Sequence, residues 1–414
     1  MKPVKIFILM LMAAGAITPA FSQPAALSLE ECLEYAAQSN PSMKTARMRI
    51  EAAKANVGTS VDIPNTAVEL TQDATEGGGM DNGLSFSQEF DFPTVYVARR
   101  KVLKAEEALA REEYGEEFNA LRGEIASAFH TVVYLKARLR LIEENMARYE
   151  EFARIAGERF EAGESSRLES LNARRLRAKM EATLHDTRLR LENSRLLLGR
   201  LTGIGEAVDA NSPELSPLAL PDGVGFFEAS DSYASKVFDA RLAIGRHNVS
   251  LARQEFWPGL SVSATSQLLI KGFNPYHIER ERFSKGDFMG FSVGVTVPLF
   301  FGAKRARLQA AGREAELIRL QKEDEMQRLS SEFLQLSNDL RQAVSRLDYY
   351  RQEGLEQSAE IKRLADISYE LGEIDYMEYL QNLETATEIE MEYLEAVEIY
   401  NQALIKIQTL KGQI

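Results

Sequence analysis

The sequence predicts a mainly helical α+β fold in which one helix–β-hairpin–helix unit occurs twice. Three observations support this prediction. Two long stretches place apolar residues at alternating spacings of three and four, the heptad pattern of coiled coils. Two shorter stretches alternate apolar with polar residues, as β-hairpins with one apolar face do. An aromatic-x-x-Gly motif ends each long helical stretch, at Phe160 and Gly163 and again, 209 positions later, at Tyr369 and Gly372.

The first 22 residues predict a secretory signal peptide. Lys2 and Lys5 precede an apolar run over residues 6–17, and the small residues Ala20 and Ser22 stand before the expected cleavage site. The run is too short for a membrane-spanning helix, which needs about 20 apolar residues. We therefore expect an exported chain whose mature form begins at residue 23.

Composition excludes several classes of protein. The formal net charge of −13 becomes −15 once Lys2 and Lys5 are removed, and an acidic chain is a poor partner for nucleic acid, whose binding depends on neutralising phosphates. The single cysteine, Cys32, excludes an intramolecular disulfide in an exported chain. Glu30 and Glu31 stand before it where a lipid-attachment site has small residues, so we expect Cys32 to be buried and unmodified.

Residues 23–210 form the first predicted repeat. Ser28 followed by Glu31 is a capping box, which predicts the start of a helix, and Asn40 with the proline after it interrupts that helix. Alternating residues over 62–92 then predict a β-hairpin, with Val, Leu and Phe on one face and Ser, Thr, Glu and Asp on the other.

The heptad pattern predicts a helix over residues 95–160 and a second, returning helix over 166–200. At 1.5 Å per residue the first would be about 100 Å long. No compact globular domain needs a helix of this length. The sequence therefore predicts an elongated helical hairpin below the β-hairpin.

Residues 211–228 are rich in proline and glycine and form a predicted linker, after which the second repeat occupies residues 229–414. It contains a β-hairpin over 259–300 and another long helix that ends at Gly372. A last helix is expected over residues 375–411.

The four predicted strands need an apolar solvent on one side and water on the other. Their length and alternation suit transmembrane β-strands, but four strands cannot close a barrel, and an open edge in lipid leaves backbone groups unsatisfied. Three copies would supply a twelve-stranded transmembrane β-barrel around a water-filled pore, continued by a long α-helical coiled-coil barrel. Aromatic residues fall at the strand ends, where a membrane-interface girdle would lie: Phe256, Trp257, Phe300 and Phe301.

An alternative of a different class is a secreted periplasmic coiled-coil protein, structural or an adaptor, that never enters a membrane. The polar face of each hairpin argues against it, because Ser, Thr and Glu suit a wet lumen better than a packed core. Histidines are scattered, and no phosphate-binding loop occurs, so we expect no enzyme, no cofactor and no metal site.

Taken together, the elements over residues 28–411 resemble the TolC-like outer membrane efflux proteins, also called outer membrane factors. The LSLEECLEYA opening, the NP that follows it and the two F/Y-x-x-G turns contribute to the resemblance. It implies a homotrimer with its strands in outer membrane lipid and its helical barrel in the periplasm. It also implies passive export in partnership with a periplasmic adaptor (membrane fusion protein) and an inner-membrane pump of the RND type.

The length and the unlipidated N-terminus are similar to the heavy-metal CzcC-like branch, which implies export of metal cations. Export of drugs and type I protein secretion remain alternatives. In each case the family is a channel for transmembrane transport and not a catalyst.

The resemblance also implies functional residues. It places both turns at the periplasmic tip, where the adaptor docks, and the candidates there are Phe160, Gly163, Ser165, Tyr369, Leu371 and Gly372. It places an acid six residues after the second glycine at the closed aperture, where Glu378 stands, with Glu169 as its counterpart in the first turn. Gln381 replaces a second family acid, so the ring is less charged. The alternative is that the glycines only end helices and Glu378 is a solvated surface residue.

Overall fold

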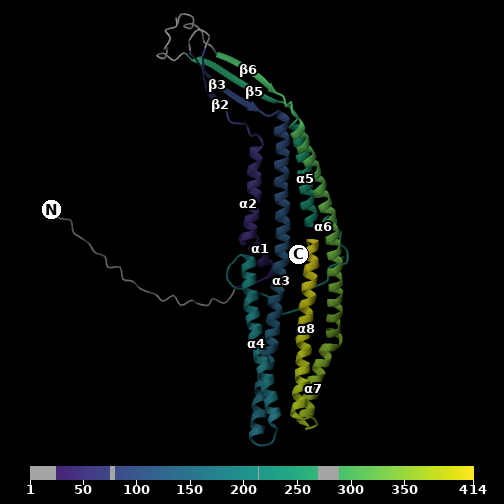
Figure 1. Cartoon of the computed structure of the whole chain (residues 1–414). Helices are drawn as coiled ribbons and strands as arrows, with labels where there is room; N and C mark the ends of the chain where they lie inside the picture. The colour runs from purple at the N-terminus through teal and green to yellow at the C-terminus, as the bar shows by residue number, and fades with distance from the viewer. Residues whose placement is uncertain (1–24, 75–79, 213, 269–288) are drawn as a thin grey trace, which may run out of the picture.

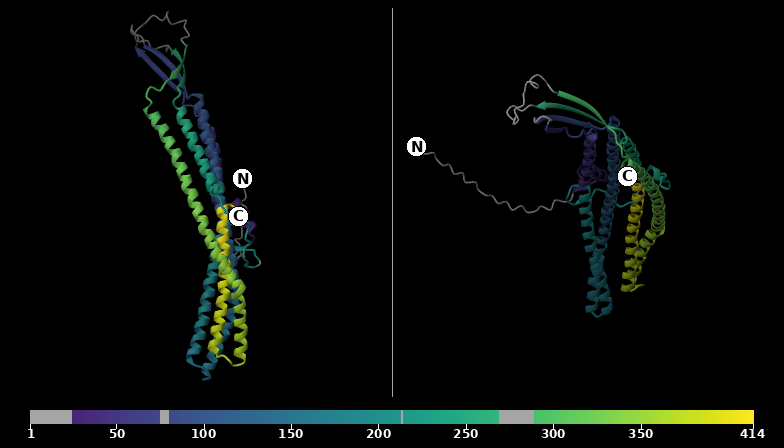
Figure 2. Two further views of the ribbon diagram at one scale, coloured as in Figure 1. Left: turned by 90° about the vertical axis from the view of Figure 1, so that its right-hand side faces the viewer. Right: turned by 45° about the horizontal axis from the view of Figure 1, so that its top comes forward.

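The computed structural model describes residues 25–74, 80–212, 214–268 and 289–414 (Figure 1). The predicted signal peptide and the loop between the strands of the second hairpin lie outside the described residues. The described chain is elongated, with a curved sheet at one end and two helical hairpins at the other (Figure 2).

The helices before the sheet begin as predicted. α1 (Leu29–Ser39) starts at the capping box, in which the Ser28 amide donates to the Glu31 carboxylate at 2.7 Å and the Glu31 amide donates to Ser28 Oγ at 3.2 Å. α2 (Pro41–Asn56) follows, and Asn40 caps its N-terminus by accepting from the Ser42 amide at 2.8 Å. A 3₁₀ turn, Val57–Ser60, leads toward the sheet.

The long helix of the first repeat is confirmed. α3 (Pro93–Glu161) has 69 residues, and α4 (Arg167–Thr202) returns beside it. The buried side chains over the lower part of α3 recur mostly at the predicted heptad spacing: Leu121, Ile125, Ala128, Val132, Leu135, Ile142, Met146, Tyr149, Ala153 and Ala156.

The second repeat contains α5 (Tyr233–Gln254), α6 (Gly302–Tyr349), α7 (Leu355–Glu370) and α8 (Tyr376–Lys411), with a 3₁₀ turn, Ala229–Asp231, before α5.

The expectation of one unbroken helix ahead of the second turn is wrong, because a π-helical segment, Tyr350–Gly354, separates α6 from α7. Tyr350 Oη donates to Glu392 of α8 at 2.7 Å. The Tyr350 ring packs so closely on Gly354 that a Cβ at this position would lie only 2.8 Å from the ring atom Cδ1. The wider turn thus accommodates an aromatic ring that the heptad pattern does not reveal.

The sheet unites the two predicted hairpins. β2 (Ala67–Ala74), β3 (Met80–Phe90), β5 (Gly259–Leu268) and β6 (Met289–Thr296) are antiparallel in the order β2-β3-β5-β6. Residues directly opposite one another in such a ladder share a face. The register therefore gathers the apolar side chains on one face: Val68, Leu70, Leu84, Phe86, Phe90, Leu260, Val262, Ala264, Phe291, Val293 and Val295.

Two features near the middle of the molecule were not predicted. β1 (Ala25–Leu27) pairs in parallel with β4 (Val208–Ala210), which joins the start of the first repeat to its end. The linker packs against α8, where the fully buried Asn401 accepts from the Leu218 amide at 2.8 Å and donates to the Ser216 carbonyl at 3.0 Å.

α3 packs against both α5 and α8 of the second repeat, and polar side chains join it to α8. Gln402 of α8 accepts from Ser127 Oγ at 2.6 Å and donates to the Ser127 carbonyl at 2.9 Å. Thr131 Oγ1 donates to Glu398 at 2.8 Å, and burial raises the pKa of the Glu398 carboxyl above its usual range. Side-chain bonds thus hold the two halves of the chain in one register.

Cys32 is buried in the core formed by α1, α3 and α4, as the sequence predicted. Burial, together with the nearby Glu31 and Glu30, raises the pKa of its thiol to about 11. Because only the thiolate attacks alkylating reagents, we expect the folded protein to resist maleimide labelling at neutral pH. Labelling of native and urea-unfolded protein followed by mass spectrometry measures this, and rapid modification of the native form would contradict it.

Candidate functional site

The turn between α3 and α4 is a Schellman motif. Gly163 has φ of 77°, a left-handed conformation that favours glycine. Its amide donates to the Phe160 carbonyl at 3.0 Å, and the Glu164 amide donates to the Arg159 carbonyl at 2.8 Å. The aromatic-x-x-Gly motif thus satisfies the last carbonyls of a long helix.

The turn between α7 and α8 repeats this geometry. Gly372 has φ of 74°. Its amide donates to the Tyr369 carbonyl at 3.1 Å, and the Glu373 amide donates to the Ser368 carbonyl at 2.8 Å. Both turns lie at the end of the molecule farthest from the sheet (Figure 1).

Glu169 and Glu378, the two candidate aperture residues, differ in their hydrogen bonds at the starts of α4 and α8. Glu169 completes a capping box, since its amide donates to Ser166 Oγ at 3.2 Å and its carboxylate accepts from the Ser166 amide at 3.5 Å. The carboxylate also accepts from the Ser166 hydroxyl at 3.2 Å. The Glu378 amide donates to Asp375 at 2.9 Å, but the Glu378 carboxylate is exposed and accepts no hydrogen bond from the described residues. Gln381 is also exposed.

The candidate tip residues differ in exposure. Leu371 is 68% exposed and Phe160 40% exposed, so both present apolar surface to solvent. Tyr369 lies inward, stacked on Tyr379 with ring centroids 4.7 Å apart. Ser165 also points inward, and its hydroxyl is buried without a hydrogen-bond partner among the described residues.

Two further apolar side chains at the tip, Leu168 and Leu171, are more than half exposed. Sequence reasoning missed both, although each is a leucine in the first turns of a solvated helix, which is an available signal for a contact surface.

An aromatic cluster connects the two helical hairpins near the tip. Tyr376 is buried, and its hydroxyl donates to the Phe152 carbonyl of α3. The Phe152 ring lies edge-on to Tyr379, with centroids 5.3 Å apart, and the Tyr379 hydroxyl donates to Asp366 at 2.7 Å. Burial raises the pKa of both tyrosines above its usual value, so they stay neutral donors. The sequence did not reveal this cluster because its members come from both repeats.

Most of the apolar face of the sheet is exposed, at Val68, Leu70, Phe86, Val262, Phe291, Val293 and Val295. Val293 is 79% exposed and Phe291 75%, and neither a helix nor a second sheet of the described chain packs over them (Figure 2). The opposite face bears the hydroxyl residues, among them Ser263 and Ser292, whose Oγ atoms are 2.8 Å apart. β2 and β6 form the two edges of the sheet. The sheet therefore lacks a core of its own within this subunit.

The predicted interface aromatics gather at the end of the sheet that adjoins the helices. Trp257 stacks on Phe92 with centroids 4.7 Å apart, and Phe256 stacks on Phe301 at 6.0 Å. Phe300 is 90% exposed. The cluster forms a band between the apolar sheet and the polar helices.

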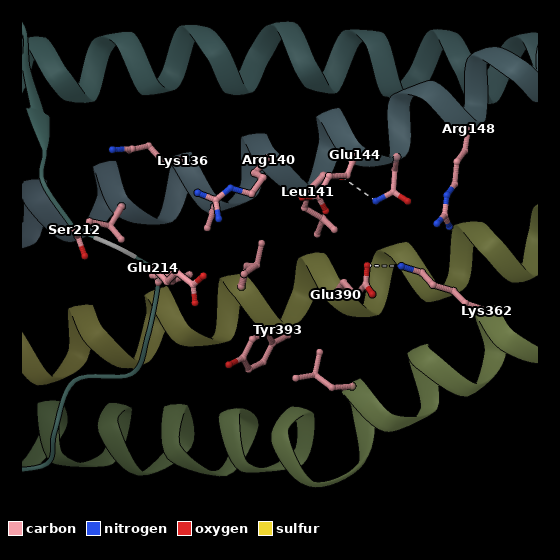
Figure 3. A pocket seen from close by; sticks show the side chains of 16 residues that line it. Lys136, Arg140, Leu141, Glu144, Arg148, Ser212, Glu214, Lys362, Glu390 and Tyr393 are labelled. Carbon is pink, nitrogen blue, oxygen red and sulfur yellow. Dashed lines mark hydrogen bonds and ion pairs between the residues drawn. The ribbon is translucent and has the colours of Figure 1, made fainter.

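A cavity of about 450 Å³ lies between the hairpins at the level of the linker (Figure 3). Its walls include Lys136, Arg140 and Arg148 of α3, and Lys362 of α7 forms an ion pair with Glu390 of α8 at 2.6 Å. The mixed charges partly compensate one another. Neither here nor elsewhere in the part of the chain that the structure describes do three His, Cys, Asp or Glu side chains lie close enough to hold a metal ion.

None of the helices in residues 25–74, 80–212, 214–268 and 289–414 is long and apolar enough to cross a membrane.

Known proteins match this chain over most of its length. A family model described as "Outer membrane efflux protein" matches residues 32–204 and 236–413. The cobalt-zinc-cadmium resistance protein CzcC of Cupriavidus metallidurans is 21% identical over 403 residues, covering 96% of this chain and 93% of CzcC.

Two solved structures illustrate the likeness in fold. The outer membrane protein VceC of Vibrio cholerae has a TM-score of 0.72 at 17% identity, covering 93% of this chain and 96% of VceC. CusC, whose structures were described in terms of folding and transmembrane channel formation, has a TM-score of 0.74 at 16% identity, covering 95% of each chain.

Proposed function

Because the chain belongs to the outer membrane efflux protein family, we propose that three copies of it form a passive exit duct for metal cations. The chain is an outer-membrane efflux channel of the tripartite kind, working with an adaptor and a pump, and it is not an enzyme. Its long helices lie in the periplasm. Its assembly as a trimer, its metal cargo and the roles of its individual residues are what we propose.

The observation that supports the duct most directly is the uncovered apolar face of the sheet. Four strands with two open edges cannot stay in lipid alone, because each unpaired backbone group there costs several kcal/mol. Pairing β2 of one copy with β6 of the next removes both edges. Three copies close a twelve-stranded barrel with Val293 and its neighbours toward lipid and Ser292 and its neighbours toward water.

Membrane fractionation tests this arrangement. We expect the protein in the outer membrane fraction and its release only by detergent, as a trimer in cross-linking. Recovery as a soluble periplasmic monomer without detergent would instead favour the secreted coiled-coil protein considered above.

The tip is the proposed adaptor-docking surface. Phe160 and Leu371 present exposed apolar surface there, while Gly163 and Gly372 set the two turns and Ser165 and Tyr369 pack behind them. In this proposal the adaptor is a periplasmic membrane fusion protein, and the pump is of the RND type.

Glu378 is the proposed aperture residue. Three exposed Glu378 carboxylates around one axis would attract cations and hold anions back. Alanine is smaller than glutamate and would widen the aperture, so we expect Glu378→Ala to raise the single-channel conductance in planar bilayers. Loss of the carboxylates should also lower the preference for cations.

Glu169→Ala is the matched control, because that carboxylate is engaged in a capping box. We expect it to leave conductance unchanged. If Glu378→Ala changed neither conductance nor ion selectivity, the assignment of Glu378 to the aperture would be wrong. Gln381, one turn away on the same helix, would then not belong to the aperture either.

Metal cations are the proposed cargo for two reasons. The sequence is similar to a protein named for cobalt, zinc and cadmium resistance. In addition, the described strands contain no Lys or Arg, whereas Glu69 and Glu89 lie on their polar face. A lumen of this charge does not repel cations.

Loss of the gene tests the cargo. We expect higher cellular zinc, cobalt or cadmium by elemental analysis and lower metal tolerance, both restored by the intact gene. Unchanged metal content with increased drug sensitivity would instead identify drugs as the cargo. Unchanged metal content with loss of a secreted protein would identify that protein as the cargo.

A further inference from the structure

Basic side chains gather just below the sheet, where α3 and α6 begin. Residues 93–104 and 302–313 contain four Lys or Arg each and no Asp or Glu. The described strands directly above contain no basic residue at all. The eight cationic residues are Arg99, Arg100, Lys101, Lys104, Lys304, Arg305, Arg307 and Arg313.

The start of α6 does not favour this arrangement. The N-terminal end of a helix carries partial positive charge, so acidic residues stabilise it and basic ones destabilise it. α1 follows the rule with Glu30 and Glu31 in its first turn, and α4 follows it with Glu169. α3 and α6 have no acid in the first turn. In α6, Lys304 and Arg305 lie in this first turn, whereas the basic residues of α3 begin at Arg99, its seventh residue, beyond the reach of the dipole. At the start of α6 the charges therefore point to an anion outside the chain.

Only part of the group is neutralised by this subunit. Arg99 pairs with Asp91 at 2.9 Å, and Arg307 lies 3.4 Å from Glu255. Lys304 donates to the Glu255 carbonyl. Five others, Arg100, Lys101, Lys104, Arg305 and Arg313, are exposed and form no ion pair with any described residue. Three of these five lie nearest the sheet: Arg100, Lys101 and Arg305.

The position of these three fits the edge of a bilayer. Arg305 lies four residues after Phe301 and Lys101 four after the exposed Val97, so each shares a helix face with an apolar residue above it. They lie about 5 and 12 Å below the first residue of their helices. Side chains lean toward the helix N-terminus, and long basic ones extend farther along an apolar surface to reach the headgroups.

We propose that Arg100, Lys101 and Arg305 form a cationic collar that binds the phosphates of anionic phospholipid headgroups in the leaflet next to the helices. The collar continues the lipid contact of the apolar sheet and the aromatic band, so it rests on the proposed function. The trimer repeats it three times around the duct. Each cation near an anionic surface strengthens lipid binding roughly fivefold.

The test compares lipid stabilisation of three proteins. The mature wild type, the variant R100Q/K101Q/R305Q and the control R174Q/R175Q/R200Q are purified in a neutral detergent. The control removes three exposed arginines of α4 that lie away from the sheet and form no ion pair with any described residue. The midpoint of thermal unfolding is then measured with added phosphatidylglycerol, with phosphatidylcholine, and with inorganic phosphate.

We expect phosphatidylglycerol to raise the midpoint of the wild type and of the control, and high salt to cancel the rise, while the collar variant shows none. Equal stabilisation of all three proteins, an equal effect of inorganic phosphate, or a rise that survives high salt would overturn the collar. R100K/R305K keeps the charge and should keep the effect, which separates charge from folding defects.

Channel conductance measured in phosphatidylcholine bilayers tests the proposed duct independently of the collar. Wild-type channels without any response to phosphatidylglycerol would overturn the collar alone, whereas absence of channels would overturn the duct. A collar variant with altered ion selectivity and undiminished lipid stabilisation would place these side chains in the lumen and also overturn the collar.

Discussion

Val293→Arg should strongly reduce assembly in the outer membrane. Val293 is central in β6, 79% exposed, and opposite Val262 on the apolar face. An arginine on the lipid face near the bilayer midplane costs about 2–4 kcal/mol in each subunit. Since 1.4 kcal/mol is a tenfold change in equilibrium, we expect the membrane-inserted fraction to fall by about tenfold or more. Quantitative blotting of outer membrane fractions measures this.

Ser292→Arg is the matched control for this prediction. Ser292 is the preceding residue of the same strand and lies on the opposite face, within hydrogen-bond distance of Ser263. An arginine there would project into water, so the variant should insert normally and shift ion selectivity toward anions. If both variants inserted equally well, the apolar face would not contact lipid, and the duct would lose its main support.

Asn401→Leu should destabilise the folded subunit by about 2–4 kcal/mol, because a leucine fits the space but leaves two backbone groups of the linker without partners. Asn401 is fully buried, and its amide group holds both the Leu218 amide and the Ser216 carbonyl. We expect a lower midpoint of thermal unfolding and faster proteolysis within residues 211–228. Circular dichroism in detergent and limited proteolysis measure the two effects.

Asn338→Leu serves as the control, since Asn338 is exposed and its side chain accepts a hydrogen bond only from Arg341 one turn away on α6. It should change the unfolding midpoint little. An equal effect of the two substitutions would mean that the linker is not held by Asn401.

Local patterns in the sequence predicted most of the elements. The capping box at Ser28, the break at Asn40 and the heptad spacing of α3 act within a few turns of one helix, so each is readable from neighbouring residues. The same holds for the alternation in the strands and for both glycine turns. The boundaries proposed for the two repeats, at 23–210 and 229–414, stay predictions.

The candidate tip was predictable only in part. The aromatic-x-x-Gly spacing located Phe160 and Tyr369, and the acid six residues beyond located Glu378. Which acid is free for an aperture depended on contacts. A capping box engages the Glu169 carboxylate, whereas the exposed Glu378 carboxylate accepts no hydrogen bond from the described residues. Tyr376 and Phe152 escaped notice because they lie 224 positions apart in the chain.

By itself, the sequence determined the duplicated order of helices and strands and the two-faced character of each strand. These follow from short-range rules: propensity, periodicity, capping and the handedness of a glycine turn. The export signal at the N-terminus stays a prediction. Only the tertiary structure decided that β3 pairs with β5, that the π segment interrupts the second long helix, and that Asn401 holds the linker. Such features depend on contacts between residues far apart in the chain, and no local pattern encodes which distant partner will bury a given side chain.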